Sequence, residues 1–299
     1  MDLYDDKNIS PMLLFEVKKP FDDENYLFEL KFDGTRALIF VEPKKVLIKN
    51  KRNIILNNTF PELLNITKMV KNKCIFDGEI IVVYDGLPSF KKLQERALLK
   101  DTIRINYMKE KYPVTFICFD ILYDKKDLTN LSLIERKKYL NKYKDNDIFV
   151  KTKYYLNDGI KLYNTVKKMN LEGIVAKEIH SKYKVNKRSK DWLKIKNLMD
   201  GDFFIGGYKE DNEGSLASLI LGSISDNEYI YIGNVTIGKN NPEFKIIKRC
   251  KPLKYSPFSG FKEKGYKFIE PKLKCTVKFI EKTDYNSLRQ PIYKSLKLD

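Results

Sequence analysis

The sequence predicts an α+β chain built from two domains, residues 1–199 and 200–299. Its length of 299 residues corresponds to about two domains of average size. Up to about residue 197, runs with strand periodicity are interspersed with runs of helical spacing. After Met199, short β-type runs separated by Gly, Asn and Asp take over, which is typical of a small β-barrel or sandwich.

Strands dominate the beginning of the first predicted domain. Residues 26–50 alternate like strands, and Asp33-Gly34 between the first two runs predicts a β-hairpin. Thr59 followed by Pro61 predicts a helix to about Val70, with Thr59 as its N-cap. Apolar periodicity predicts the other elements of this domain: strands at 74–84, 114–123, 171–177 and 191–196, and helices at 89–99, 131–143 and 158–169.

The chain carries 57 Lys and Arg against 40 Asp and Glu, a formal net charge of +17. This excess predicts a polyanionic partner, either nucleic acid or an anionic membrane surface, although a solvated lysine-rich surface explains the composition equally well. Both predicted domains are basic, unlike a neutral enzyme with a basic tail. No apolar run approaches the roughly 20 residues of a membrane span, and no basic amphipathic helix stands out, so we expect no membrane partner.

The N-terminus and the cysteines predict the compartment. The opening residues MDLYDDKNIS are acidic and polar, which is untypical of signal and transit peptides. The four cysteines are scattered without a C-x-x-C pair, which argues against a zinc ribbon or a disulfide framework and fits a reducing compartment. We therefore expect a cytoplasmic protein without a secretion signal.

Reactive side chains narrow the chemistry. His180 is the one histidine, which nearly excludes a histidine base or a multi-histidine metal site, and we expect it to be structural or solvated. Neither G-x-x-x-x-G-K-[ST] nor G-x-G-x-x-G occurs, so a P-loop and a Rossmann fold lose their main support. Lysines, carboxylates and a metal ion remain, and phosphoryl transfer is a chemistry that depends on such charges.

One short segment, Glu29–Arg36, concentrates charges of both signs beside a glycine turn. In strand alternation Glu29, Lys31 and Asp33 share one face, which by itself is more typical of an exposed, ion-paired strand. The motifs that follow in order favour a functional role for this segment over an exposed, ion-paired strand. They are KRN at 51–53, DGE at 77–79, FDIL at 119–122, EGIVAK at 172–177 and WLKIK at 192–196.

This ordered set resembles the covalent nucleotidyltransferase superfamily, and within it the ATP-dependent DNA ligases, over nearly the whole chain. In the second half, Tyr208, Gly222 and the runs 231–235 and 288–293 are similar to the ligase modules of bacterial end-joining ligases, and less similar to small viral and phage ligases. The resemblance implies an adenylation (nucleotidyltransferase) domain of antiparallel sheets and helices over 1–199, followed by an OB-fold β-barrel over 200–299.

The resemblance also implies a reaction in three steps. Lys31 would attack the α-phosphorus of ATP and hold AMP as a phosphoramidate. AMP would pass to the 5′-phosphate of a nick, and the 3′-hydroxyl would then seal the nick and expel AMP. Nearby cations would favour the neutral, nucleophilic amine of Lys31.

Further roles follow from the resemblance, although each residue alone is more typical of a core or surface position. Phe119 matches an aromatic residue that stacks on adenine, and Glu29 matches a residue near the adenine amino group. Glu79 and Glu172 match carboxylates at the ribose and the metal ion, expected to be Mg²⁺ with Mn²⁺ as an alternative. The nucleotide-binding set is Glu29, Arg36, Arg52, Glu79, Phe119, Lys177, Lys194 and Lys196, and the nick-contacting set is Asp33, Arg36 and Arg52. Trp192 is interpreted as packing.

The C-terminal motif departs from the family pattern R-x-D-K. The matching residues are Lys297-Leu298-Asp299, preceded by Arg289. Because lysine lacks the bidentate phosphate geometry of arginine, we expect less efficient lysine adenylation unless Lys282 or Lys294 assists.

The expected partner is nicked duplex DNA, enclosed by basic surfaces of both domains that move about a hinge at 197–202. A Ku-type end-binding protein or a separate repair polymerase would act in trans. We expect the protein to be a monomer of bacterial, phage or viral origin. A role in DNA replication, repair, recombination or double-strand break repair stays open. The alternatives are an RNA ligase, a GTP-using capping enzyme, and a non-catalytic nucleic-acid-binding module with a decayed nucleotidyltransferase domain.

Overall fold

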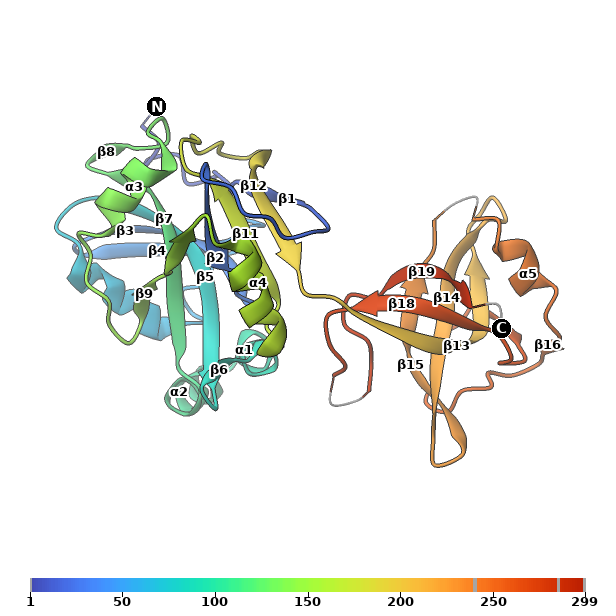
Figure 1. The fold of residues 1–299 in the computed structure, drawn as a ribbon. Coiled ribbons are helices and arrows are strands. Elements are labelled where there is room, and N and C mark those ends of the chain that lie inside the picture. Colours follow the sequence, from blue (N-terminus) through green and yellow to red (C-terminus); the bar gives the residue numbers. More distant parts are fainter. Residues whose placement is uncertain (1, 239–240, 284–285, 298–299) are drawn as a thin grey trace. The chain divides into compact units, whose positions relative to one another are not determined.

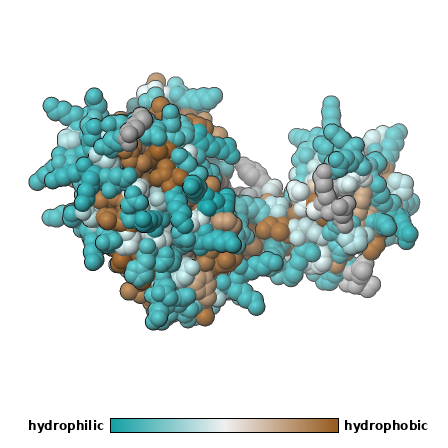
Figure 2. Space-filling model, turned by 90° about the horizontal axis from the view of Figure 1, so that it is seen from above, coloured by the Kyte–Doolittle hydropathy of each residue, from teal (hydrophilic) through white to brown (hydrophobic). Residues whose placement is uncertain are grey.

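The structure is a computed structural model that describes residues 2–238, 241–283 and 286–297. The chain divides into two compact units, Met1–Asn197 and Leu198–Asp299 (Figure 1). Hydrophilic side chains cover most of the surface seen in Figure 2, with smaller apolar areas between them. Within the described residues, every helix is too short or too polar to cross a membrane.

Two sheets form the framework of the first unit. The five-stranded sheet has the order β1-β12-β11-β2-β10 and consists of β1 Leu13–Glu16, β12 Arg188–Lys196, β11 Gly173–Glu178, β2 Tyr26–Leu30 and β10 Tyr154–Leu156. The other sheet has the order β4-β3-β5-β7-β8, with β6 added to β5 and β9 to β7. Its strands are β4 Lys45–Asn50, β3 Thr35–Glu42, β5 Cys74–Tyr84, β7 Val114–Asp124, β8 Lys126–Asp127, β6 Leu87–Pro88 and β9 Phe149–Lys151.

Strand alternation on β3 explains how these layers share apolar side chains. Ile39 and Val41 pack into the core that also holds the 3-10 helix η1 (Pro61–Met69) and α1 (Phe90–Ala97). Phe40 points to the opposite face and shares a second core with Leu27 of β2 and Trp192 of β12. The two sheets therefore face each other. The outer side of the five-stranded sheet is covered by α4 (Gly159–Lys168).

The predicted hairpin at Asp33-Gly34 is wrong. Strand β2 pairs with β10 and β11, whereas β3 pairs with β4 and β5 of the other sheet. The turn therefore carries the chain from one sheet to the other. A Cβ at Gly34 would lie 2.2 Å from the carbonyl oxygen of Ile80, so the close approach to β5 requires glycine. An Asp-Gly dipeptide predicts a turn, but it does not predict which strands pair on either side of it.

The other predicted elements of this unit are mostly confirmed. Strands β5, β7, β11 and β12 and helices α1, α3 (Leu133–Leu140) and α4 lie where apolar periodicity predicts them. The segment after Thr59 is a 3-10 helix, and Phe60, which makes no side-chain cap, occupies the N-cap position instead of Thr59. Helix α2 (Thr102–Lys111) was not predicted, because its apolar residues Ile103 and Tyr107 are exposed and form no core stripe.

The second unit is a curled antiparallel sheet with one short helix, α5 (Phe244–Lys248). Its strands are β13 Met199–Glu210, β14 Leu216–Ser225, β15 Glu228–Thr236, β16 Pro252–Leu253, β17 Lys267–Ile269, β18 Lys274–Phe279 and β19 Ile292–Lys297. The long strand β13 pairs with β18 along its first half and with β14 and β17 beyond it. Leu288 donates its amide to the Ile232 carbonyl at 2.8 Å, which joins the last segment to β15. The expected α+β class is confirmed, and this curled sheet is consistent with an OB-fold.

Candidate active site

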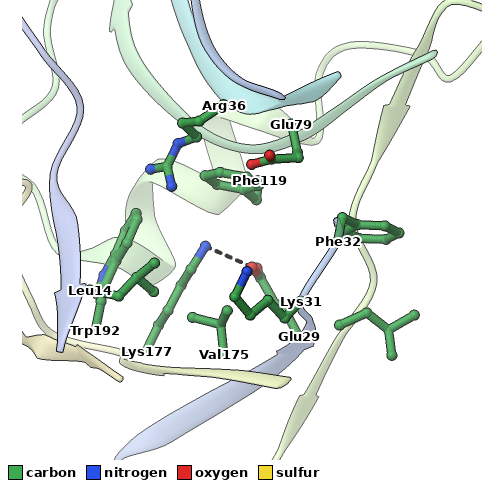
Figure 3. Close-up of a pocket in the computed structure, with 11 residues that line it drawn as sticks. Leu14, Glu29, Lys31, Phe32, Arg36, Glu79, Phe119, Val175, Lys177 and Trp192 are labelled. Atoms are coloured by element: carbon green, nitrogen blue, oxygen red, sulfur yellow. Dashed lines mark ion pairs between the residues drawn. The ribbon is translucent and has the colours of Figure 1, made fainter. Parts of the chain in front are cut away.

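A pocket of about 370 Å³ opens between the facing sheets of the first unit (Figure 3). Residues from both sheets line it: Leu14, Glu29, Leu30, Lys31, Phe32, Arg36, Glu79, Phe119, Val175, Lys177 and Trp192. Six of the residues predicted from the motifs are thus brought together, although they come from strands far apart in the sequence. Flat apolar walls and a few charged groups in one cleft are typical of a small-molecule site.

Lys31 follows directly on β2, at the edge of the pocket. Its amide donates to the Gly173 carbonyl at 2.9 Å, so the backbone continues alongside β11. The Lys31 ammonium lies 2.8 Å from Oε1 of Glu172, and both side chains are largely buried. The sheet thus holds an amine and a carboxylate in contact at the pocket entrance.

Glu79 faces these two residues from β5 of the other sheet. Burial raises the pKa of Glu79 to about 7, and the nearby charges of Arg36 and Lys31 oppose that rise. Glu172 is close enough to add to the rise by charge repulsion. Two carboxylates near one another are oxygen donors of the kind that hard divalent cations prefer. Among the described residues, no group of three or more His, Cys, Asp or Glu side chains could hold a metal, so remaining ligands would come from substrate and water.

Arg36 is held in place by a buried acid. Its Nε and Nη2 donate to the two carboxylate oxygens of Asp77 at 2.6 and 2.7 Å, and Tyr183 donates its hydroxyl to the same acid at 2.7 Å. The guanidinium lies 4.4 Å from the ring centre of Phe119. This bidentate pair fixes the direction in which Arg36 faces the pocket.

The inner end of the pocket carries a buried cluster of opposite charges. Glu29 lies 2.6 Å from the ammonium of Lys177, and its other oxygen contacts the ammonium of Lys137 on α3. Burial lowers the pKa of Lys177 to about 8, while Glu29 opposes that change. The Lys177 ammonium also lies 4.2 Å from the centre of the Phe119 ring. Trp192 is fully buried, as its interpretation as packing predicts.

Lys194 and Lys196 lie on one face of β12, as strand alternation predicts. Both pair with Glu16 of the neighbouring strand β1, at 3.2 and 3.3 Å. Neither lysine is among the residues that line the pocket. The structure thus gathers these cations on the sheet that forms one pocket wall, beside the cavity itself.

Other predicted residues lie outside the pocket lining. Asp33 is on the connection between the sheets, and Arg52 is exposed in a turn after β4. Arg289 pairs with Glu281 at 2.9 Å, within the second unit. Lys297 pairs with Asp202 at 2.5 Å, also within that unit. Asp299 lies outside the described residues.

Sequence reasoning missed several residues that support the site: Glu16, Asp77, Lys137, Val175 and Tyr183. Asp77 and Val175 lie inside recognised motifs, so the motifs were a usable signal for them. The other three lie in no motif that the sequence singled out, and only the pairing of distant segments reveals them.

The combination of facing sheets, a lysine–carboxylate cleft and a small β unit defines the class: a two-domain nucleotidyltransferase.

Comparison with known families and proteins narrows this class. Residues 11–196 match the ATP dependent DNA ligase domain, and residues 212–299 match the ATP dependent DNA ligase C terminal region. The chain is 32% identical over 293 residues to the SPbeta prophage-derived DNA ligase-like protein LigB of Bacillus subtilis, which covers 96% of this chain and 98% of that protein. It is 27% identical to the multifunctional non-homologous end joining protein LigD of Mycolicibacterium smegmatis, over 98% of this chain but 39% of that protein.

Solved structures support the fold. A chain of mycobacterial DNA ligase D complexed with ATP and MES aligns with a TM-score of 0.60 and 24% identity, over 99% of this chain and 97% of that one. A Lig E DNA ligase described as binding DNA with a minimal scaffold aligns with a TM-score of 0.64 and 16% identity, over 95% and 98%.

The chain belongs to the family of ATP-dependent DNA ligases. It is an enzyme of this class, and family membership implies the use of ATP and a divalent metal ion. The RNA ligase, capping enzyme and non-catalytic alternatives are not favoured by these comparisons.

Proposed function

We propose that this ligase seals nicks in duplex DNA through a covalent AMP adduct on Lys31. The observation that carries the proposal is the position of Lys31, whose ammonium lines the pocket 2.8 Å from Glu172 and beside Glu79. A lysine is a nucleophile only as the neutral amine, so it must lose a proton before it attacks. Glu172 is an acceptor within reach of that proton.

The reaction divides into three transfers. In the first, the Lys31 amine loses a proton and forms a bond to the α-phosphorus of ATP, while the bond from that phosphorus to pyrophosphate breaks. An oxygen of the nick 5′-phosphate then attacks the same phosphorus, the nitrogen–phosphorus bond breaks, and Lys31 regains a proton. Finally the 3′-hydroxyl loses its proton, attacks the 5′-phosphorus and releases AMP, leaving a phosphodiester.

The pocket walls suit a nucleotide. Phe119 and Val175 line the pocket from opposite sheets and are assigned to the two faces of the base, with Glu29 and Lys177 at its polar edge. Arg36, fixed by Asp77, is assigned to the sugar and the nick phosphate together with Arg52 and Asp33. Lys194 and Lys196 are assigned to the α-phosphate, for which they would have to exchange their pairing with Glu16.

We propose Mg²⁺ as the metal ion, with Mn²⁺ as a substitute. The residues that would hold it are Glu79 and Glu172, whose carboxylate oxygens are the donor type that both ions accept. When bound, the metal would neutralise phosphate charge during the transfers.

The assignment extends to the whole chain. Residues 1–199 would form the adenylation domain and residues 200–299 the OB-fold domain. Lys297, with Arg289 and Asp299, would assist the first step. The protein would act as a cytoplasmic monomer on nicked DNA, with a Ku-type end-binding protein or a repair polymerase joining in trans. The non-homologous end joining role in the name of LigD supports that last part.

The decisive experiment incubates the full chain with α-labelled ATP and Mg²⁺, then denatures it in detergent. A labelled protein band is expected for the wild type and for Lys19→Ala, an exposed lysine, but not for Lys31→Ala. No labelled band, or a band that survives Lys31→Ala, would refute the proposal. Labelled GTP in place of ATP tests the capping alternative, and nicked RNA in place of nicked DNA tests the RNA ligase alternative.

A further inference from the structure

Lys137 is a buried lysine outside the pocket lining. It contacts Glu29, a pocket residue at the end assigned to the base. Lys137 lies on α3 and is 3% exposed, whereas the next residue, Lys138, is exposed. The Lys137 ammonium contacts Oε1 of Glu29, and Oε2 of the same carboxylate lies 2.6 Å from Lys177. Each oxygen of Glu29 is therefore held by a different ammonium group.

These two lysines approach Glu29 from different layers of the unit. Lys177 lies on β11, the strand next to β2, and lines the pocket with Glu29 (Figure 3). Lys137 reaches the carboxylate from α3, which packs on β7, and its ammonium also lies 5.4 Å from the ring centre of Tyr154. The two oxygens of Glu29 are thus held by ammonium groups that come from different layers.

Contacts other than those of Lys137 hold helix α3 in place. Arg136 is fully buried and donates to Asp120 from Nε at 2.9 Å and from Nη2 at 2.8 Å. Its Nη1 also donates to the carbonyls of Leu131 and Ser181. Ser132 and Glu135 form a capping box at the start of the helix. The loss of one ammonium group from position 137 should therefore alter Glu29 more than it alters the helix.

We infer that Lys137 is a positioning residue for base recognition. It holds Glu29, which the family resemblance places near the adenine amino group, so that the carboxylate can accept a hydrogen bond from that exocyclic amine. This inference rests on the proposed function, in which the pocket binds ATP. Without Lys137, the carboxylate would turn toward Lys177 and the amine would lose a charged acceptor. A hydrogen bond to a charged group is worth roughly a 10- to 100-fold difference in binding.

The test compares ATP with purine riboside 5′-triphosphate, which lacks the exocyclic amine. Single-turnover rates of adduct formation on Lys31, measured over a range of nucleotide concentrations, give a maximal rate constant and a half-saturating concentration for both nucleotides. For Lys137→Met, the half-saturating concentration of ATP should rise roughly 10- to 100-fold while that of the analogue changes less than about 3-fold. The maximal rate constant with ATP should stay within about 3-fold, because Lys31 and Glu172 are untouched.

Three further variants make the result specific. Lys138→Met, one residue along the same helix but exposed, should behave as the wild type. Lys137→Arg, which keeps the charge, should restore most of the preference for ATP. In a Glu29→Gln background, Lys137→Met should add no further change in preference, because the group that it positions is gone. If Lys137→Met does not fold by its thermal unfolding, Lys137→Gln is measured in its place.

Equal loss for ATP and the analogue would overturn the inference, as would a wild type without preference for ATP or a folded Lys137→Arg that fails to restore it. A wild type that forms no adduct with ATP would instead refute the proposed function. A wild type that forms the adduct, with a preference unchanged by Lys137→Met, would refute the positioning role alone.

Discussion

Replacing Glu79 by glutamine is expected to stabilise the first unit at pH 8 and to have little effect at pH 5. Glu79 sits in the pocket wall on β5, where burial raises its pKa from 4.5 to about 7. Its carboxylate is therefore harder to ionise in the folded protein than in the unfolded chain. The glutamine side chain has nearly the same shape and carries no charge to bury.

The sign and size follow from proton linkage. Between pH 4.5 and about 7 the unfolded chain releases this proton while the folded protein retains it, so stability falls as pH rises through that window. Above pH 7 the whole cost of burying the charge is present, at most about 3 kcal/mol. The gain in unfolding free energy from Glu79→Gln should thus approach about 3 kcal/mol at pH 8 and stay below about 1 kcal/mol at pH 5.

The assay is urea unfolding followed by the fluorescence of Trp192, the single tryptophan of the chain. Trp192 is fully buried in the first unit, so its signal follows that unit specifically. EDTA keeps divalent cations from binding the carboxylate. Glu24→Gln, at an exposed position, is the control and should change stability by less than about 0.5 kcal/mol at every pH. A gain independent of pH, or a loss at pH 8, would refute the reasoning.

Two other predictions concern the buried acid and the net charge. Asp77→Ala should destabilise the first unit by about 3–5 kcal/mol in the same fluorescence assay, because Arg36 and Tyr183 lose their shared buried partner. A loss below about 1 kcal/mol would contradict this assignment, and Asp147→Ala, at an exposed position, is its control. Binding to nicked DNA, measured by fluorescence anisotropy, should weaken steeply and linearly in log K against log salt, because 57 basic residues include many that can neutralise phosphates. A slope near zero would contradict binding through contacts with the DNA phosphates.

Much of the fold could be predicted from the sequence because the central strands carry their own signal. The runs that form β5 and β7 are long and apolar, since they are covered on both faces, and a long apolar run between turn residues indicates a buried strand wherever it pairs. The partners of a strand are a different matter. The turn at Asp33-Gly34 looks local in the sequence, yet the chain crosses to another sheet there.

The site was predictable to the extent that its residues lie in recognisable motifs. Lys31, Glu79, Phe119 and Lys177 line one pocket, although their assigned roles stay predictions until the adduct is tested. The groups that orient the motif residues were not predicted from the sequence. Lys137 is 108 residues from Glu29 in the sequence, and such a distance leaves no periodicity to detect.

The sequence by itself determined the chemical class of this protein, its two-part organisation and its basic character, because residue types, motif order and charge are properties of the chain. Only the tertiary structure decided which charges meet. In the folded protein Glu29 forms ion pairs with two lysines, and Arg36 forms one with an aspartate. Lys194 and Lys196 form ion pairs with a glutamate on a neighbouring strand. The physical reason is range: a motif is read along a few residues, whereas ion pairs between buried groups depend on strand pairing and helix packing that join distant segments.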